Sequence, residues 1–238
     1  MPRVRRNKII IVWAIVTLVV IVDQIIKIYV KTNFTLRESV EVTPWFYLSF
    51  IENNGMAYGM EFFDKYFLTV FRMFAVGAFS WMLYKVLDRV TTGFVIVVAL
   101  IIAGALGNII DCVFYGQLFT DSYGHVAQWT VGTGLEGYAP WFKGKVVDMF
   151  YFPLIRFWWP DWMPAAGEIV NFQLSAFNFQ LSFAWPDWLP CRNEPFEFFK
   201  PIFNFADAAI SVGVALLVLC YYRTLNRLQE EGKQVQGI

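Results

Sequence analysis

Four long apolar runs, separated by more polar segments, dominate the pattern of hydrophobic and polar residues along the chain. We expect these runs to form helices over about residues 9–30, 66–84, 93–115 and 202–222. Each run is close to the twenty or so residues that a helix needs to cross the hydrocarbon core of a bilayer. The pattern therefore predicts four membrane-spanning helices, with 31–65 and 116–200 as long connections.

Residues within 31–65 show a different pattern. Apolar and polar residues alternate over Val40–Thr43 and Trp45–Ile51, which is typical of short strands. We therefore expect an all-α integral membrane protein with a small extracytoplasmic β element and a large extracytoplasmic loop. The whole chain, 1–238, is interpreted as a single membrane-embedded domain.

Composition supports a membrane protein. Apolar residues make up 58% of the chain and charged residues only 16%, whereas a soluble domain carries about 25% charged residues. The zero formal net charge gives no support for nucleic-acid binding. Cys112, Cys191, Cys220 and the one histidine, His125, fit no zinc-site spacing. We therefore expect no metal or other cofactor, and we interpret His125 as a surface residue.

The distribution of lysine and arginine indicates the orientation. Segments 1–8, 85–92 and 223–238 carry nine of these residues in 32 positions, whereas 31–65 and 116–200 carry eight in 120. Cytoplasmic segments are enriched in positive charge. We therefore expect both termini in the cytoplasm and both long connections outside.

The segment 116–200 holds seven of the ten tryptophans and a near-repeat. WPDWMP at 159–164 is followed by WPDWLP at 185–190. Tryptophan often lies at the headgroup level of a membrane, so we interpret the repeat as two interfacial turns. A role in gripping a substrate is the alternative.

Acidic residues interrupt three of the apolar runs at similar heights. Counted from the cytoplasmic end of each run at 1.5 Å per residue, Asp23 lies ~21 Å, Asp111 ~27 Å and Asp207 ~22 Å up. Asn108 and Asn204 each precede one of these acids by three residues, which places them on the same helix face. An ionisable residue within a span is costly and usually faces a polar interior. We therefore expect one polar site near the outer membrane surface.

Two cations in the runs have simple interpretations. Asp23 and Lys27 are spaced i, i+4 and can form a structural pair, with direct chemistry as the alternative. Arg72 can extend outward to the interface, with a role in the site as the alternative. Gly104 and Gly107 allow another helix to approach closely.

Five short motifs occur in order along the chain. They are Asp23-Gln24-x-x-Lys27, Asn53-x-Gly55-x-Ala57-Tyr58, Gly104-x-x-Gly107-Asn108-x-x-Asp111, Gly144-x-Val146-Val147-Asp148 and Phe203-Asn204-x-Ala206-Asp207. Together they resemble the motifs of lipoprotein signal peptidase (signal peptidase II), a family of bacterial membrane aspartyl proteases with four spans.

The resemblance implies that Asp148 and Asp207 are the catalytic pair. It also implies a set of residues that bind substrate or shape the site, namely Asn53, Gly55, Asn108, Asp111, Asn204 and Ala206. The implied reaction is cleavage of the signal peptide of a prolipoprotein, immediately before a cysteine that carries a diacylglyceryl group. The implied setting is the bacterial inner membrane, with the site open to the outer side. Prolipoproteins and membrane lipids are then the partners of a monomeric enzyme.

The chain also departs from the family pattern. Cys112 stands where the family usually has an arginine that is expected to hold the substrate, a role that Lys145 or Arg156 can take over. Met56 replaces a small residue. The connection 116–200 is much longer than that of the family.

Asp121 lies closer to the third run and is an alternative to Asp148, but it lacks the V-V-D context, so we prefer Asp148. Two neighbouring carboxylates that share a proton can activate water and protonate the leaving nitrogen. Which of the two is the base stays open, because such a pair titrates as a unit. A small transporter or proton conduit and a non-catalytic homologue are the rival interpretations.

Overall fold

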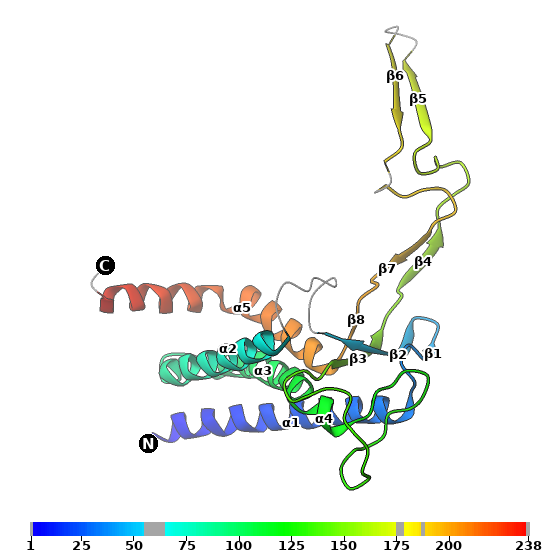
Figure 1. Ribbon diagram of the computed structural model, residues 1–238. Helices are drawn as coiled ribbons and strands as arrows, with labels where there is room; N and C mark the ends of the chain where they lie inside the picture. Colours follow the sequence, from blue (N-terminus) through cyan, green and yellow to red (C-terminus); the bar gives the residue numbers. More distant parts are fainter. Residues whose placement is uncertain (1, 55–64, 175–178, 187–188, 237–238) are drawn as a thin grey trace. The chain divides into compact units, whose positions relative to one another are not determined.

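The computed structural model describes residues 2–54, 65–174, 179–186 and 189–236. Its long helices in these ranges are α1 (Arg3–Asn33), α2 (Lys65–Val86), α3 (Thr92–Ile110) and α5 (Phe205–Gln236) (Figure 1). At its C-terminal end α3 continues through a π-helical turn, η2 (Asp111–Tyr115), into the short α4 (Gly116–Leu118). Within this described part of the chain, four helices are long and apolar enough to cross a membrane. The four predicted spans are therefore confirmed.

The last helix differs most from its predicted bounds. Ile202–Phe203 form a short strand, β8, and α5 begins only at Phe205. At the other end α5 continues beyond the predicted limit of 222 to Gln236. Hydropathy marks the part of a helix that lies in lipid, whereas a polar extension carries no such signal.

Helix α3 is the centre of the helical unit and packs against α1, α2 and α5. In its most apolar window 56% of the residues are buried, against 11–17% in the other three helices. A Cβ atom at Gly104 would collide with the carbonyl oxygen of Ala206, and one at Gly107 would lie 2.7 Å from Asp23 Oδ2. The close helix contact that these glycines predict is confirmed.

A four-stranded sheet brings distant segments of the chain together. Its order is β1-β2-β3-β8, and the first three strands are β1 (Ser39–Thr43), β2 (Phe46–Asn53) and β3 (Val146–Tyr151). The strands predicted within 31–65 are confirmed as β1 and β2. The all-α class is not confirmed, because further strands form in segments that were expected to be loop.

The strand order places three candidate site residues on neighbouring strands. β2 ends at Asn53, β3 contains Asp148, and Asn204 directly follows β8. A buried apolar cluster that includes Phe50, Phe119 and Met149 packs these strands against the C-terminal part of α1. The sheet is therefore fixed to the helices that carry the other candidate residues.

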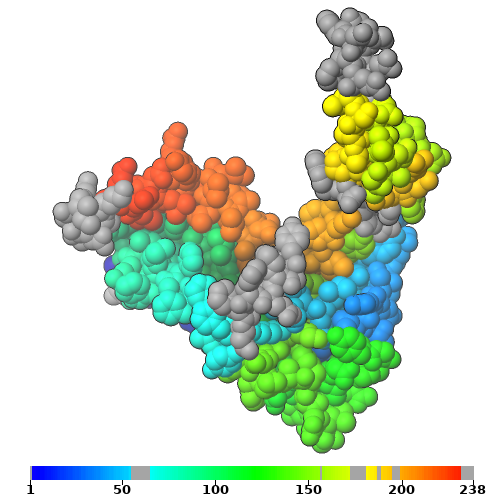
Figure 2. Space-filling model, turned by 45° about the horizontal axis from the view of Figure 1, so that its top comes forward, coloured from blue at the N-terminus to red at the C-terminus, as the bar shows by residue number. Residues whose placement is uncertain are grey.

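The chain divides into two compact units. The helical unit comprises Met1–Val40, Leu48–Phe150 and Ile202–Ile238, and the second unit comprises Glu41–Tyr47 and Tyr151–Pro201. It contains two antiparallel pairs, β4 (Ile155–Trp158) with β7 (Pro195–Phe198) and β5 (Ile169–Leu174) with β6 (Phe179–Ala184). Figure 2 shows β5 and β6, yellow-green and yellow, side by side. The register pairs Ile155 with Phe198 and Ile169 with Ala184.

The two copies of the WPDW repeat lie between these strand pairs. The first connects β4 to β5, and the second connects β6 to β7. Backbone hydrogen bonds cross between the two connections, from Trp185 N to the oxygen of Glu168 at 2.8 Å and from Asn193 N to the oxygen of Trp159 at 3.0 Å. The repeat therefore marks the two sides of one joint between the strand pairs.

Candidate active site

Asp148 lies in the middle of β3 and is 3% exposed. Two asparagine amides donate to its carboxylate: Asn204 Nδ2 lies 2.6 Å from Oδ1, and Asn53 Nδ2 lies 3.2 Å from Oδ2. Both donors come from the strands or strand ends on either side of β3. The sheet thus supplies two hydrogen bonds to a buried acid, as such a group requires.

Asp207 lies in the first turn of α5 and is half-buried. Asn108 Nδ2 on α3 donates to Asp207 Oδ1 at 2.7 Å. At the helix start, Asp207 N donates to Asn204 Oδ1 at 2.8 Å and Asn204 N lies 3.4 Å from Asp207 Oδ2. These reciprocal contacts form a capping box, in which the N-terminal end of the helix also favours a negative charge.

Asn204 connects the two carboxyl groups. Its Nδ2 donates to Asp148, its Oδ1 accepts from the backbone of Asp207, and its side chain is fully buried. Because one amide binds both neighbours, the acid of β3 and the acid of α5 are held in a fixed relation. The proximity also affects the electrostatics. The pKa of Asp148 is raised to about 7, mainly by burial and next by the charge of Asp207.

The orientation of the Asn108 amide follows from its partners. Lys27 Nζ donates to Asn108 Oδ1 at 2.8 Å, and Asn204 Nδ2 donates to the same oxygen at 3.1 Å. A lysine ammonium can only donate, so the oxygen of Asn108 must face Lys27. The amide NH₂ group is then directed to Asp207. A buried cation in α1 therefore orients the hydrogen bond that the candidate acid in α5 receives.

Lys27 is the centre of a buried ionic cluster. Its Nζ lies 2.9 Å from Asp23 Oδ2 and 2.7 Å from Asp111 Oδ2, and all three side chains are fully buried. Gln24 Nε2 donates to Asp111 Oδ1 at 2.8 Å and Tyr115 Oη donates to Gln24 Oε1 at 3.1 Å. Pairing and hydrogen bonding together offset the large cost of burying these charges.

The two acids of this cluster also bind the backbone next to the candidate pair. Asp23 Oδ1 accepts from Ala206 N at 2.9 Å, and Asp111 Oδ2 accepts from Val147 N at 3.4 Å. Ala206 and Val147 each directly precede a candidate catalytic residue, Asp207 and Asp148. The ionic cluster therefore positions both backbone segments of the pair without a direct contact to either carboxyl group.

A cavity of about 320 Å³ lies against Asp207 and Asn108 between α2, α3 and α5. Arg72 of α2 also lines it, and the other described lining residues are apolar. Among the described residues no group of three histidine, cysteine or acidic residues is arranged to hold a metal ion. The chemistry that the site offers is thus that of two neighbouring carboxyl groups beside a mainly apolar cavity.

Comparison with known proteins agrees with this geometry. A family model described as signal peptidase (SPase) II matches residues 15–223. The chain belongs to this family. A lipoprotein signal peptidase of Porphyromonas gingivalis is 43% identical over 226 residues, which cover 94% of this chain and 88% of that protein. One of Amoebophilus asiaticus is 31% identical, covering 87% and 75%.

A solved structure described as a bacterial membrane enzyme, determined in meso at 2.3 Å, has a TM-score of 0.51 at 20% identity. It covers 91% of this chain and 90% of that chain and supports the fold alone. The resemblance drawn from the five motifs is confirmed. Membership of the family, together with the four apolar helices, indicates a multi-pass protein of the bacterial inner membrane.

The structure distinguishes the two acids of this chain, Asp148 and Asp121, that were considered for the same position. Asp148 is buried beside Asn204, whereas Asp121 is exposed and lies 3.7 Å from His125 Nε2. His125 is itself exposed, as predicted. Gly55, another candidate site residue, lies outside the described residues, as does Met56.

A cation from α2 lies beside Cys112. Arg72 Nη1 lies 3.8 Å from Cys112 Sγ, and Arg72 lines the cavity with Asp207. Arg72 therefore lines the candidate site, which is the alternative that the sequence left open. Lys145, which we considered for the missing arginine's role, pairs with Glu52 Oε2 at 3.0 Å. Arg156 pairs through its backbone with Glu197 in the other unit.

A second buried ion pair was missed from the sequence. Lys31 Nζ lies 2.6 Å from Glu52 Oε1, with both side chains buried, and Lys145 contacts the other oxygen of Glu52. Burial alone would raise the pKa of Glu52, but the charges of Lys31 and Lys145 outweigh it and hold that pKa below its ordinary value. A signal was present, because Lys31 continues the i, i+4 spacing of Asp23 and Lys27.

Proposed function

We propose that the protein is an aspartic endopeptidase that removes the signal peptide from prolipoproteins, with Asp148 and Asp207 as its catalytic pair. The family and the names of its curated relatives support the substrate. The observation that carries the catalytic assignment is the position of Asn204, which binds both the Asp148 carboxylate and the backbone of Asp207.

The pair accounts for each proton in peptide hydrolysis. The ionised carboxylate takes a proton from water as the water oxygen attacks the carbonyl carbon. The protonated carboxyl group donates a hydrogen bond to the carbonyl oxygen and then passes its proton to the leaving nitrogen. The raised pKa of Asp148, about 7, supports a pair that retains one proton near neutral pH. Because the pair titrates together, the base and the acid are not assigned to one residue each.

The proposed substrate carries a diacylglyceryl group on the cysteine that follows the cleaved bond. The site has a polar side at the half-buried Asn108 and Asp207 and an adjoining apolar cavity, which suits a lipid-modified peptide. We place both termini in the cytoplasm and the site near the outer membrane surface, in agreement with the distribution of Lys and Arg. The proposed enzyme acts as a monomer among membrane lipids.

Substitution of the pair tests this assignment. Asp148→Asn and Asp207→Asn keep the side-chain shape but remove the ionisable carboxyl group, so each should lower turnover of a lipidated prolipoprotein by about 10²- to 10⁴-fold or more. Asp121→Asn is the matched control, because Asp121 is an exposed acid of the same connection. It should retain wild-type turnover.

Two outcomes would reject the proposal. Normal cleavage by either pair variant, with Asp121→Asn inactive, would move the catalytic role to Asp121. Equal cleavage of lipidated and unlipidated prolipoprotein by the wild-type protein would reject the lipid as part of the recognised substrate.

A further inference from the structure

We propose that Arg72 of α2 binds a carbonyl oxygen of the substrate and thereby positions the bond to be cleaved beside Asp207. This inference rests on the proposed function, because it assigns a binding role within the same site. The carbonyl oxygen belongs either to the peptide backbone or to an ester of the diacylglyceryl group. Both sources have the same hydrogen-bonding chemistry and both adjoin an apolar chain.

The first support is the composition of the cavity. Arg72, Asn108 and Asp207 are the polar residues among its described lining residues. Asn108 Oδ1 already accepts from Lys27 and Asn204, and an ionised Asp207 can only accept hydrogen bonds. A guanidinium carries five N–H donors in one plane. Arg72 is therefore suited to bind an acceptor-only carbonyl group in this cavity.

The second support is the way in which α2 directs Arg72 inward. Tyr66, Thr69 and Arg72 are spaced by three residues and so lie along one side of the helix. Thr69 Oγ1 donates to the backbone oxygen of Phe142 at 3.0 Å, and the rings of Tyr66 and Phe142 are 5.5 Å apart. These contacts fix the rotation of α2. The same side of the helix then presents Arg72 to the cavity, with Nη1 at 3.8 Å from Cys112 Sγ.

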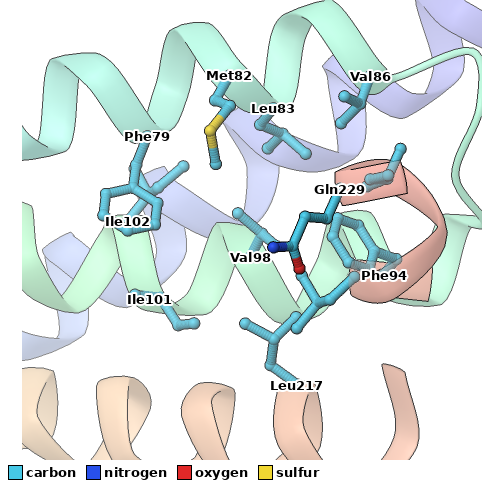
Figure 3. A pocket seen from close by; sticks show the side chains of 12 residues that line it. Phe79, Met82, Leu83, Val86, Phe94, Val98, Ile101, Ile102, Leu217 and Gln229 are labelled. Carbon is cyan, nitrogen blue, oxygen red and sulfur yellow. The ribbon is translucent and has the colours of Figure 1, made fainter. Parts of the chain in front are cut away.

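The third support is the apolar space that continues from Arg72. Phe79, Ile101 and Ile102 line the cavity at Asp207 and also a second cavity of about 350 Å³. Figure 3 shows Phe79 and Met82 extending from α2 toward the side chains of α3 in this second cavity. An arginine in a membrane span is costly and usually has a polar role. Here it lies where an apolar chain and a carbonyl group can be bound together.

The test compares Arg72→Gln and Arg72→Lys with wild-type protein on a lipidated prolipoprotein. The glutamine variant should lower kcat/KM by about 10- to 100-fold, mainly through a higher KM, because a charged donor is lost. The lysine variant keeps the charge and should recover part of this loss. Lys85→Gln, on the exposed cytoplasmic end of the same helix, is the matched control and should behave as wild type.

A second substrate distinguishes the two carbonyl sources. If Arg72 binds a lipid ester, replacing the ester linkages by ethers should cost the wild-type protein the same factor as Arg72→Gln, and the two changes together should cost no more than either alone. If Arg72 binds a peptide carbonyl, the factor by which Arg72→Gln lowers kcat/KM and the factor by which the ether substrate lowers it should multiply.

The inference would be overturned if a folded Arg72→Gln variant had the same kcat/KM and KM as the wild-type protein. In that case the proposed function would still stand, because the wild-type protein cleaves the substrate. A loss in Arg72→Gln that is matched by a lower thermal unfolding temperature and by no recovery in Arg72→Lys would also overturn it, because the effect would then be structural. No cleavage by the wild-type protein would reject the proposed function itself.

Discussion

In the helical unit Lys27, Asp111 and Asn204 are fully buried, and the side chain of each contacts several partners. In the unit of Tyr151–Pro201 large side chains such as Trp162 are exposed, and the strands are held by backbone pairing. A buried charge without its partner is very costly, whereas an exposed side chain can usually be changed at little cost. The comparison predicts strict side-chain requirements in the first unit and tolerance in the second.

The largest effect is expected at Lys27. Lys27→Met keeps the length of the side chain but leaves Asp23 and Asp111 buried without a cation, so it should lower the free energy of unfolding by about 3–5 kcal/mol. Thermal unfolding of the purified protein in detergent measures this loss. Lys85→Met on α2 is the control and should leave the unfolding temperature unchanged. A stable Lys27→Met variant would show that the ionic cluster does not hold the helices together.

Glu52→Gln tests a second buried pair, and a smaller effect is expected because Lys145 is partly exposed. The change leaves Lys31 without its carboxylate and should cost about 1–3 kcal/mol of unfolding free energy. The pKa of Glu52 in the folded protein lies below its ordinary value. The stabilisation that Glu52 provides is therefore fully present at pH values above the ordinary pKa, and it is lost as pH falls through the folded pKa. The difference in unfolding temperature between wild type and Glu52→Gln should therefore shrink in acid. An equal difference at all pH values would contradict the ionic origin of the effect.

The pH dependence of turnover tests the hydrogen bond between Asn53 and Asp148. The pair must keep one proton, so kcat/KM should fall as pH rises through about 7, the raised pKa of Asp148. Asn53 Nδ2 favours the ionised form and so lowers that pKa. Asn53→Ala should then move the alkaline limb of the pH profile upward by about 0.5 to 1 pH unit. A downward shift would contradict the assigned donor.

The same pKa has a consequence for stability. Because the folded pKa of Asp148 lies above the ordinary 3.8, the folded protein binds more protons than the unfolded chain between these two values. The contribution of Asp148 to the free energy of unfolding is therefore highest below about pH 4 and falls as pH rises to about 7. Asp148→Asn should remove this pH dependence.

The helical unit could be predicted from the sequence in more detail than the second unit, for physical reasons. The length of an apolar run is a local property, so the four spans were predictable. The similar heights of Asp23, Asp111 and Asp207 indicated one polar layer, but not that Lys27 lies between Asp23 and Asp111. That arrangement depends on the close packing of α3 against its neighbours. The place of Asp148 came only from the family resemblance, because the strand that carries it is far from the helices in sequence.

The orientation of Arg72 could not be inferred from local pattern. The orientation of Arg72 is set by the contacts of Thr69 and Tyr66 with Phe142, some seventy residues away in the chain. The antiparallel strand pair β5 and β6 of the second unit has exposed apolar side chains, for example Ile169 and Leu181. The sequence of β6, FQLSFA, nevertheless alternates apolar and polar residues, which is a strand signal that was missed.

The smallest effect is expected in the second unit, at Trp162 in the first copy of the WPDW repeat. Trp162 is 81% exposed, so Trp162→Ala should change the free energy of unfolding by less than about 0.5 kcal/mol and leave turnover in detergent unchanged. Trp185 is the contrasting position, because its Nε1 donates to the oxygen of Pro190 at 3.1 Å and its backbone pairs with Glu168. Trp185→Ala should make the joint more sensitive to limited proteolysis than Trp162→Ala does. If Trp162→Ala instead lowers turnover of the lipidated substrate as strongly as Arg72→Gln, the repeat takes part in substrate binding and the contrast between the two units fails.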